Sequence, residues 1–357
     1  MAHVAPVRLV PAHVAVVALA LTALAIFTLL PVLGARAGWP WLSLAMTFVA
    51  IPLLDAWVGP ARRGGAERVL PRALAAWLPR AQVPLQAALL VQAVALLPSL
   101  TAIEAVVLAL SVGTVTGGIG ITVAHELGHR AARLDRVLAR VLLVSVGYGH
   151  FYVEHNRGHH VRVATAADPA SAPRGMNVYR FLLRSIGGSF VHAWRLEAMR
   201  LARLGRPALH PSNWVLTGSL LWLALLALAA FAGGLAVAGF LAGQALWAVA
   251  LLEIVNYIEH YGLRRRRLPN GRPEPVRPEH SWNADFVVSN WLLFNLQLHS
   301  DHHAHVERPF ETLRTVPQAP QLPAGYPTMV LIALVPPLWF AVMDARLPPP
   351  AALSDAA

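Results

Sequence analysis

The chain has 357 residues, of which 56% are hydrophobic and only 13% are charged, and its formal net charge is +11 at neutral pH. The length alone would allow two soluble domains, but this composition favours a single integral membrane domain over residues 1–357. Cysteine is absent, which excludes disulfides, thiolate metal ligands and iron–sulfur clusters held by this chain.

Long apolar segments recur along the sequence. A membrane-spanning helix needs about 20 predominantly apolar residues, and two shorter apolar segments, 137–146 and 329–343, predict interfacial or buried helices instead. The first long segment lacks a small-residue cleavage site, so we interpret it as a retained helix. We expect an all-α protein whose last residues, 348–357, are disordered. The six predicted transmembrane helices are 13–34, 41–58, 82–100, 102–124, 214–233 and 236–256.

The basic residues, all of them arginines, predict the orientation of these helices. If the spans alternate from a cytoplasmic N-terminus, Arg36 is the one arginine in an outer connection, in agreement with the positive-inside rule. The segments 125–213 and 257–347 then form a cytoplasmic helical cap of a multi-pass cell (inner) membrane protein. The arginine cluster 264–267 directly follows a span, where such a cluster is expected, so it does not indicate nucleic-acid binding.

Nine of the sixteen histidines lie in four clusters within this cap or at the helix ends that lead into it. Histidines four residues apart project from one face of a helix, whereas adjacent histidines point about 100° apart, toward two different ions. One metal ion rarely takes more than six ligands, so nine histidines predict two metals at the cytoplasmic face. The nine are His125, His129, His155, His159, His160, His260, His299, His302 and His303.

Three other interpretations of the histidine clusters explain them less well. Any one of these histidines alone would be a surface or interfacial residue, but nine at such spacings are not explained that way. The segment His125-Glu-Leu-Gly-His129 matches the zinc-protease motif, yet a zinc protease needs only one or two further ligands. A metal transporter would place its site near the middle of the bilayer rather than at helix ends. The isolated His150, His280 and His305 are predicted to have other roles.

Acidic and amide side chains beside the clusters could hold the second ring nitrogen of the ligands, which would orient the rings. The alternative for each is helix capping or surface charge. The six candidates are Glu126, Glu154, Asn256, Glu259, Asp285 and Asp301.

Two features bear on a substrate path. Gly117, Gly118 and Gly120 give the fourth span a small-residue face, which predicts close helix packing and could also open room for a substrate from the lipid. Trp57, in the second span, is a candidate limiter of substrate length, although an interfacial anchor is the more common role of such a tryptophan.

The clusters closely resemble those of the membrane alkane 1-monooxygenases, within the wider group of membrane di-iron hydroxylases and fatty-acid desaturases. The resemblance covers about residues 40–315. Tyr261-Gly262 after His260 distinguishes this family from the desaturases. The segments that carry it are His125-Glu-Leu-Gly-His-Arg130, His150-Phe-Tyr-Val-Glu-His-Asn-Arg-Gly-His-His-Val-Arg-Val-Ala-Thr165 through Asp168-Pro-Ala-Ser171, Asn256-Tyr-Ile-Glu-His-Tyr-Gly262, and Ser281-Trp-Asn283 through Leu296-Gln-Leu-His-Ser-Asp-His-His-Ala304.

The resemblance implies two iron ions held by the nine histidines, with O2 as co-substrate. It also implies hydroxylation of the terminal methyl of n-alkanes taken from the bilayer, with electrons from rubredoxin and its reductase. A related fatty-acyl desaturase or aryl-methyl hydroxylase is the alternative. Two departures concern donor docking: Leu298 stands where the family usually has arginine, and Val306-Glu-Arg-Pro309 follows His305 where the family commonly continues directly with proline.

Overall fold

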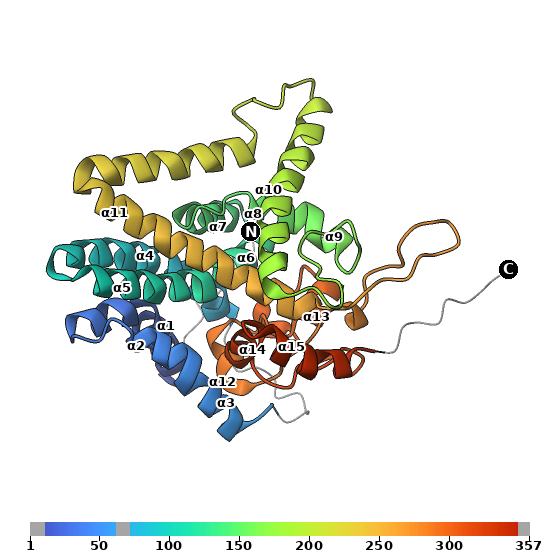
Figure 1. The fold of residues 1–357 in the computed structure, drawn as a ribbon, viewed down its shortest axis with the longest axis horizontal. Helices are drawn as coiled ribbons and strands as arrows, with labels where there is room; N and C mark the ends of the chain where they lie inside the picture. The colour runs from blue at the N-terminus through green and yellow to red at the C-terminus, as the bar shows by residue number, and fades with distance from the viewer. Residues whose placement is uncertain (1–10, 62–71, 349–357) are drawn as a thin grey trace, which may run out of the picture.

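The computed structural model describes residues 11–61 and 72–348, so all but the first residue of the predicted tail lies outside it. Long helices lie side by side, and the shorter helices gather at one end of this bundle (Figure 1). Within the described ranges there is no β-strand, only isolated bridges. The helices are α1 Pro11–Arg36, α2 Leu42–Ala45, α3 Ile51–Val58, α4 Arg72–Leu96, α5 Ala102–Val115, α6 Thr122–His129, α7 Arg133–Ser145, α8 Phe151–Glu154, α9 His160–Arg162, α10 Val178–Ala202, α11 Trp214–His260, α12 Val287–Leu292, α13 His299–Ala304, α14 Tyr326–Ala333 and α15 Pro336–Met343.

Four helical segments of the described chain are long and apolar enough to cross a membrane: Val16–Arg36, Leu74–Ser99, Ala102–His129 and Trp214–His260. The shorter apolar segment Leu42–Val58 coincides with the predicted second span. The prediction of a helical membrane protein is therefore confirmed. The number of six spans stays a prediction.

One half of the difference in number arises at Leu42–Val58, which is too short to be counted, and the other half at α11, which has 47 residues. A straight helix of that length would reach about 70 Å, more than twice the thickness of the hydrocarbon core. It bends at Gly234, whose φ of 81° and ψ of 173° are non-helical, and Figure 1 shows the two arms at an angle. Glycine accepts this conformation because it lacks a Cβ. The predicted segments 214–233 and 236–256 are the two arms.

The small-residue face of the fourth predicted span packs directly against α11. The helix runs through a π-helical turn, Thr116–Ile121, between α5 and α6. A Cβ on Gly117 would lie 2.7 Å from the backbone oxygen of Ala248, so only glycine permits this approach. Thr116 Oγ1 donates a 2.9 Å hydrogen bond to Gln244 Oε1 beside it. Close helix packing is thus confirmed at Gly117, whereas a Cβ on Gly118 would meet open space.

The apolar segment 329–343 forms two short helices, α14 and α15, because Pro336 and Pro337 cannot continue a helix from the preceding turn. Both pack beside the end of α11, where Tyr257 and Trp339 lie 4.8 Å apart between ring centroids. This second core holds the last turn of α11, and therefore His260, in place.

Candidate metal centre

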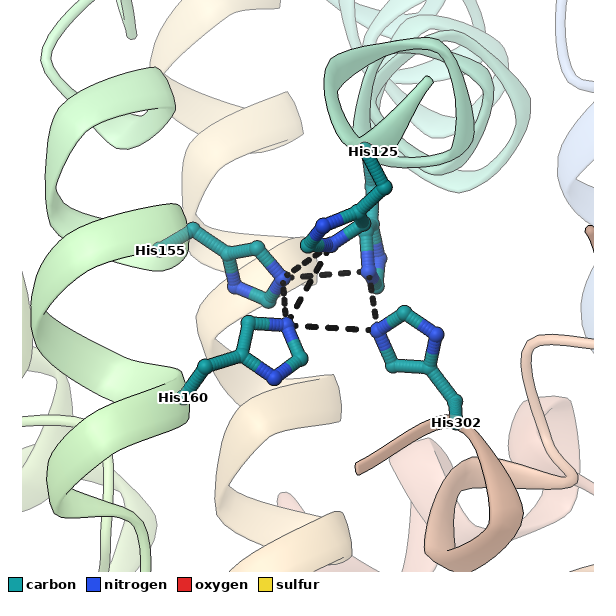
Figure 2. A group of neighbouring side chains, drawn as sticks. His125, His155, His160 and His302 are labelled. Carbon is teal, nitrogen blue, oxygen red and sulfur yellow. Dashed lines mark hydrogen bonds between the residues drawn. The ribbon is translucent and has the colours of Figure 1, made fainter. Parts of the chain in front are cut away.

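Nine histidines converge where α6, the segment α8–α9, the end of α11 and α13 meet. Their ring nitrogens form two groups, and within each group the ligand atoms all lie within 4.8 Å of one another. Figure 2 shows four members of the larger group, His125, His155, His160 and His302, with their rings turned toward one centre. The larger group has five histidines, His125, His129, His155, His160 and His302, and the smaller has four, His159, His260, His299 and His303.

Helix geometry explains which histidine joins which group. His155 and His159 are four residues apart, and the expectation that they share a face is wrong. Residues His155–His159 form a π-helical turn, whose i to i+5 hydrogen bonding brings His160 rather than His159 beside His155. In α13 the helix is regular, so His299 and His303 share the smaller group and His302 points to the larger one. Each adjacent pair is thereby divided between the two groups, as the spacing predicted.

The nitrogen spacing in both groups fits metal ligation. Two nitrogens bound at right angles to one ion, each about 2.1 Å from it, lie about 3 Å apart. In the five-histidine group, Nε2 of His125 lies 2.8 Å from that of His302 and 3.0 Å from that of His155. In the four-histidine group, Nε2 of His299 lies 2.9 Å from that of His303 and 3.2 Å from that of His260.

Burial keeps most of these rings neutral, which leaves their nitrogens available as ligands. Burial, followed by the neighbouring rings, lowers the pKa of His155, His299 and His303 well below the usual value. His159 differs, because a carboxylate faces it. Burial alone would lower the pKa of His159, but the charge and hydrogen bond of Asp168, together with the charges of Glu154 and Glu259, raise that pKa to about 9.

Asp168 is the one carboxylate found on the outer nitrogen of a ring in either group, among the described residues. Its Oδ2 accepts a 3.0 Å hydrogen bond from His159 Nδ1 and a 2.6 Å hydrogen bond from Ser171 Oγ. The chain reverses at Ala164, whose φ is 58°, and Ser171 Oγ also accepts from its N–H. The sequence pattern does not reveal this hydrogen bond, because Asp168 is nine residues from His159, a separation that no regular helix brings together.

Of the six predicted supporting side chains, Glu259 alone touches either histidine group in the described structure. Its Oε2 lies 3.2 Å from His299 Nε2, the nitrogen that faces the group, and its Oε1 accepts a 2.8 Å hydrogen bond from Tyr326. The Glu259 carboxylate therefore lies beside the nitrogens that face the centre of the group, and not beside the outer nitrogen of a ring.

The other five bond elsewhere, so the expectation that they hold ligand rings is wrong for this structure. Their partners are Arg130 for Glu126, His192 for Glu154, Glu253 for Asn256, Asn290 and Thr315 for Asp285, and His305, Arg308 and the Arg314 N–H for Asp301.

The three isolated histidines lie outside both groups, as predicted. The His150 ring packs edge-on against Tyr148 and Phe190. His280 Nε2 lies 3.3 Å from Glu274, and His305 Nδ1 lies 3.1 Å from Asp301.

Two cavities lie in the helix bundle, and the second borders the five-histidine group. The first spans about 500 Å³, part of it open to the surroundings, between α1, the segment Leu42–Val58, the π-helical turn at Thr116 and α12, and its walls are almost entirely apolar. The second, also partly open, spans about 230 Å³, and its walls include Thr122, His125, Phe294 and His302. No side chain of the four-histidine group lines either cavity.

Comparison with known proteins agrees with this centre. A family model for fatty acid desaturases matches residues 101–333, which carry all four histidine clusters. Alkane 1-monooxygenase 2 of Pseudomonas aeruginosa is 46% identical over 321 residues, covering 87% of this chain and 84% of that protein.

Two further relatives mark the range of the similarity. Alkane 1-monooxygenase 1 of Alcanivorax borkumensis is 42% identical over 317 residues, or 87% of this chain and 78% of that protein. The hydroxylase component of a Pseudomonas putida xylene/toluene monooxygenase is 31% identical over 234 residues, or 66% of this chain and 62% of that protein. The chain therefore belongs to the fatty acid desaturase family and, within it, to the alkane 1-monooxygenases.

Proposed function

We propose that this protein is an alkane 1-monooxygenase that hydroxylates the terminal methyl of medium- or long-chain n-alkanes. The observation that carries the proposal is the presence of two histidine groups in a bundle that holds an apolar cavity and a second cavity lined by His125 and His302. An unactivated alkane has no polar handle, so a site for it must position the chain through shape and apolar contact. Relatives 46% and 42% identical to this chain bear the name of this activity.

The proposed ligands of two iron ions are the nine histidines, divided five and four. Imidazole suits iron, and nine neutral or carboxylate-paired rings fit two ions better than one. With two electrons and two protons supplied, such a centre would use O2 to convert a terminal C–H bond to an alcohol and release the second oxygen atom as water. Asp168 fixes the ring of His159 in this scheme, and Tyr326 fixes the carboxylate of Glu259.

The proposed topology has six spans, with the N-terminus and the histidine groups on the cytoplasmic side of the inner membrane and the whole chain forming one domain. The bend at Gly234 supports it, because each arm of α11 is long enough to cross the bilayer alone. The connections at the opposite end of the bundle, such as Leu97–Ser99, are short.

Rubredoxin, reduced by its reductase, is the proposed electron donor. An arginine-rich cytoplasmic face would attract an acidic carrier. The departure at Leu298 offers no side-chain surface to a donor, because Leu298 is 0% exposed and lies directly before α13. Arg308, in the departing segment 306–309, forms a 2.7 Å ion pair with Asp301 and so braces the loop after α13.

Hydroxylation of an aryl methyl group is the second candidate, since a xylene/toluene monooxygenase component is 31% identical to this chain. Desaturation, the third outcome, would form an alkene and insert no oxygen.

Product analysis tests the proposal. Membranes containing the protein, with rubredoxin, its reductase and NADH, would be given hexane, decane, hexadecane and para-xylene separately under 18O2. We expect 18O-labelled 1-alkanols and about two irons per chain, in line with two groups of ligands. A variant with His302→Ala controls for background activity. Formation of alkene, or of methylbenzyl alcohol alone, would contradict the proposal.

A further inference from the structure

The two cavities follow one another along a single helical segment. Val115, Gly118 and Ile119 line the first cavity, and Thr122 and His125 line the second. All five belong to the helical segment Ala102–His129, so this one segment supplies a wall of both cavities. The path begins at partly exposed Gly118, on the apolar bundle, and ends at His125.

The opposite wall changes from one cavity to the next between consecutive residues. Leu293 lines the first cavity and Phe294 lines the second. Phe294 is 6% exposed, and its ring packs edge-on against Phe310, with 5.2 Å between centroids. Phe310 also lines the second cavity. An aromatic pair therefore stands where the two spaces meet.

The backbone at this point adopts an uncommon conformation. Phe294 and Asn295 have φ angles of 51° and 56°, in the left-handed region that a bulky side chain such as phenylalanine rarely occupies. The turn is held by a 2.8 Å hydrogen bond from the Asn295 N–H to the Asn290 oxygen, and by a 3.1 Å hydrogen bond from Asn295 Nδ2 to the Phe310 oxygen. Strain of this kind persists where the surroundings enforce it and is concentrated at functional sites.

We propose that the Phe294 ring determines specificity, as the barrier that sets how far an alkane chain advances from the bilayer-side cavity toward His125 and His302. The inference rests on the proposed function. The ring narrows the path so that only the slim methyl end passes it, while the rest of the chain stays among apolar side chains. The same geometry assigns the reacting end of the substrate to the five-histidine group, since His125 and His302 are the histidines that line the second cavity.

Replacing Phe294 with a smaller residue should make hydroxylation less selective for the terminal carbon. In Phe294→Ala the two cavities merge, and a chain can enter beyond its first carbon. We expect the ratio of 2-alkanol to 1-alkanol to rise about tenfold, because one methylene in an apolar pocket is worth roughly that factor in specificity. Phe294→Leu, which keeps an apolar side chain of intermediate size, should give an intermediate ratio. Iron content should stay at the wild-type level, because Phe294 is not a ligand.

A second variant tests the path from its other end. A side chain added at Gly118 would enter open space that lines the first cavity. Gly118→Leu should therefore reduce turnover of hexadecane about tenfold relative to that of hexane. Gly239→Leu is the matched control, since Gly239 is an exposed glycine of α11 whose Cβ would also meet nothing.

The measurement is the product distribution from hexane, decane and hexadecane for the wild type and each variant. A wild type that makes no alkanol would refute the proposed function itself. Wild-type 1-alkanol together with an unchanged alkanol ratio in both Phe294 variants would overturn the role of Phe294 alone. If Phe294→Ala does not accumulate in membranes, the ratio measured for Phe294→Leu decides.

Discussion

The two histidine groups share ring chemistry but differ in their surroundings. The five-histidine group borders the two-cavity path through His125 and His302, and its His129 ring is only partly buried. The four-histidine group is buried throughout and has carboxylates beside it, Asp168 on His159 and Glu259 on His299. If each group holds a metal as proposed, the two metal positions would be unequal, one beside the proposed substrate path and one beside carboxylates.

The largest expected effect comes from removing one ligand of each group. His302→Ala and His260→Ala should each abolish alkanol formation, exceeding the roughly 100-fold that loss of a ligand's hydrogen-bond partner costs. Iron per chain should fall in both variants, as measured by elemental analysis of purified protein. His150→Ala, outside both groups, is the control. Full activity in either ligand variant would mean that the two groups do not act as one centre.

A smaller effect is expected from the carboxylate that distinguishes the four-histidine group. Asp168→Asn keeps the size of the side chain but removes the charge that His159 Nδ1 faces, so iron affinity should fall by about 10- to 100-fold. Iron retention during dialysis against a chelator measures this directly. Asp285→Asn is the matched control, because Asp285 bonds to Asn290 and Thr315 and to no ligand. Equal iron loss in the two variants would remove Asp168 from the centre.

Tyr326→Phe should have a milder effect, confined to the same group. It deletes the 2.8 Å hydrogen bond to Glu259 Oε1, and one such bond is worth about 1 kcal/mol, or roughly a fivefold change. The ratio of alkanol formed to iron bound should fall by about that factor. Tyr179→Phe is the control, since the Tyr179 hydroxyl donates to the Leu334 oxygen at the surface. A fall of the same size in Tyr179→Phe would point to general loosening of the fold.

The smallest effect is expected at Glu197 of α10, outside both histidine groups, and concerns the stability of the fold at low pH. This loss of stability limits the pH range in which the variants can be compared. Burial opposes ionisation of Glu197, but hydrogen bonds from Arg200, the Trp214 N–H and Arg157 outweigh it and lower its pKa to about 2. The usual value is 4.5, so this carboxylate stabilises the fold above about pH 4.5 and progressively less as the pH falls toward 2. Thermal unfolding in detergent should show this loss. In Glu197→Gln the same pH change should have a smaller effect.

Sequence patterns predicted much of the site because local geometry determines much of it. All nine clustered histidines lie in the two groups, and the adjacent pairs 159–160 and 302–303 divide between them, as the angle between neighbouring helical residues requires. The pattern failed at His155, where a π-helical turn replaces the regular helix that the spacing assumed. It also failed for the supporting carboxylates, since sequence proximity to a histidine says little about the direction of a side chain.

The residues along the proposed substrate path could not be predicted from local sequence patterns either. Trp57 was the candidate limiter from sequence, but it is 83% exposed and lines neither cavity, in keeping with an interfacial anchor. Phe294 is separated from the wall formed by α5 and α6 by more than 160 residues in the chain, so no local pattern connects it with Gly118 or His125. Only the tertiary packing places Phe294, Gly118 and His125 along one proposed substrate path.

Hydropathy and histidine spacing alone predict a helical membrane protein with enough histidine ligands for two metals at the ends of its helices. Hydropathy and helical spacing are local properties, and they survive whatever the helices pack against. The tertiary structure decided the division into five and four, the pairing of Asp168 with His159 and the place of Phe294. Each depends on a departure from regular backbone, at the turn His155–His159, at Ala164 and at Phe294–Asn295, which long-range contacts impose.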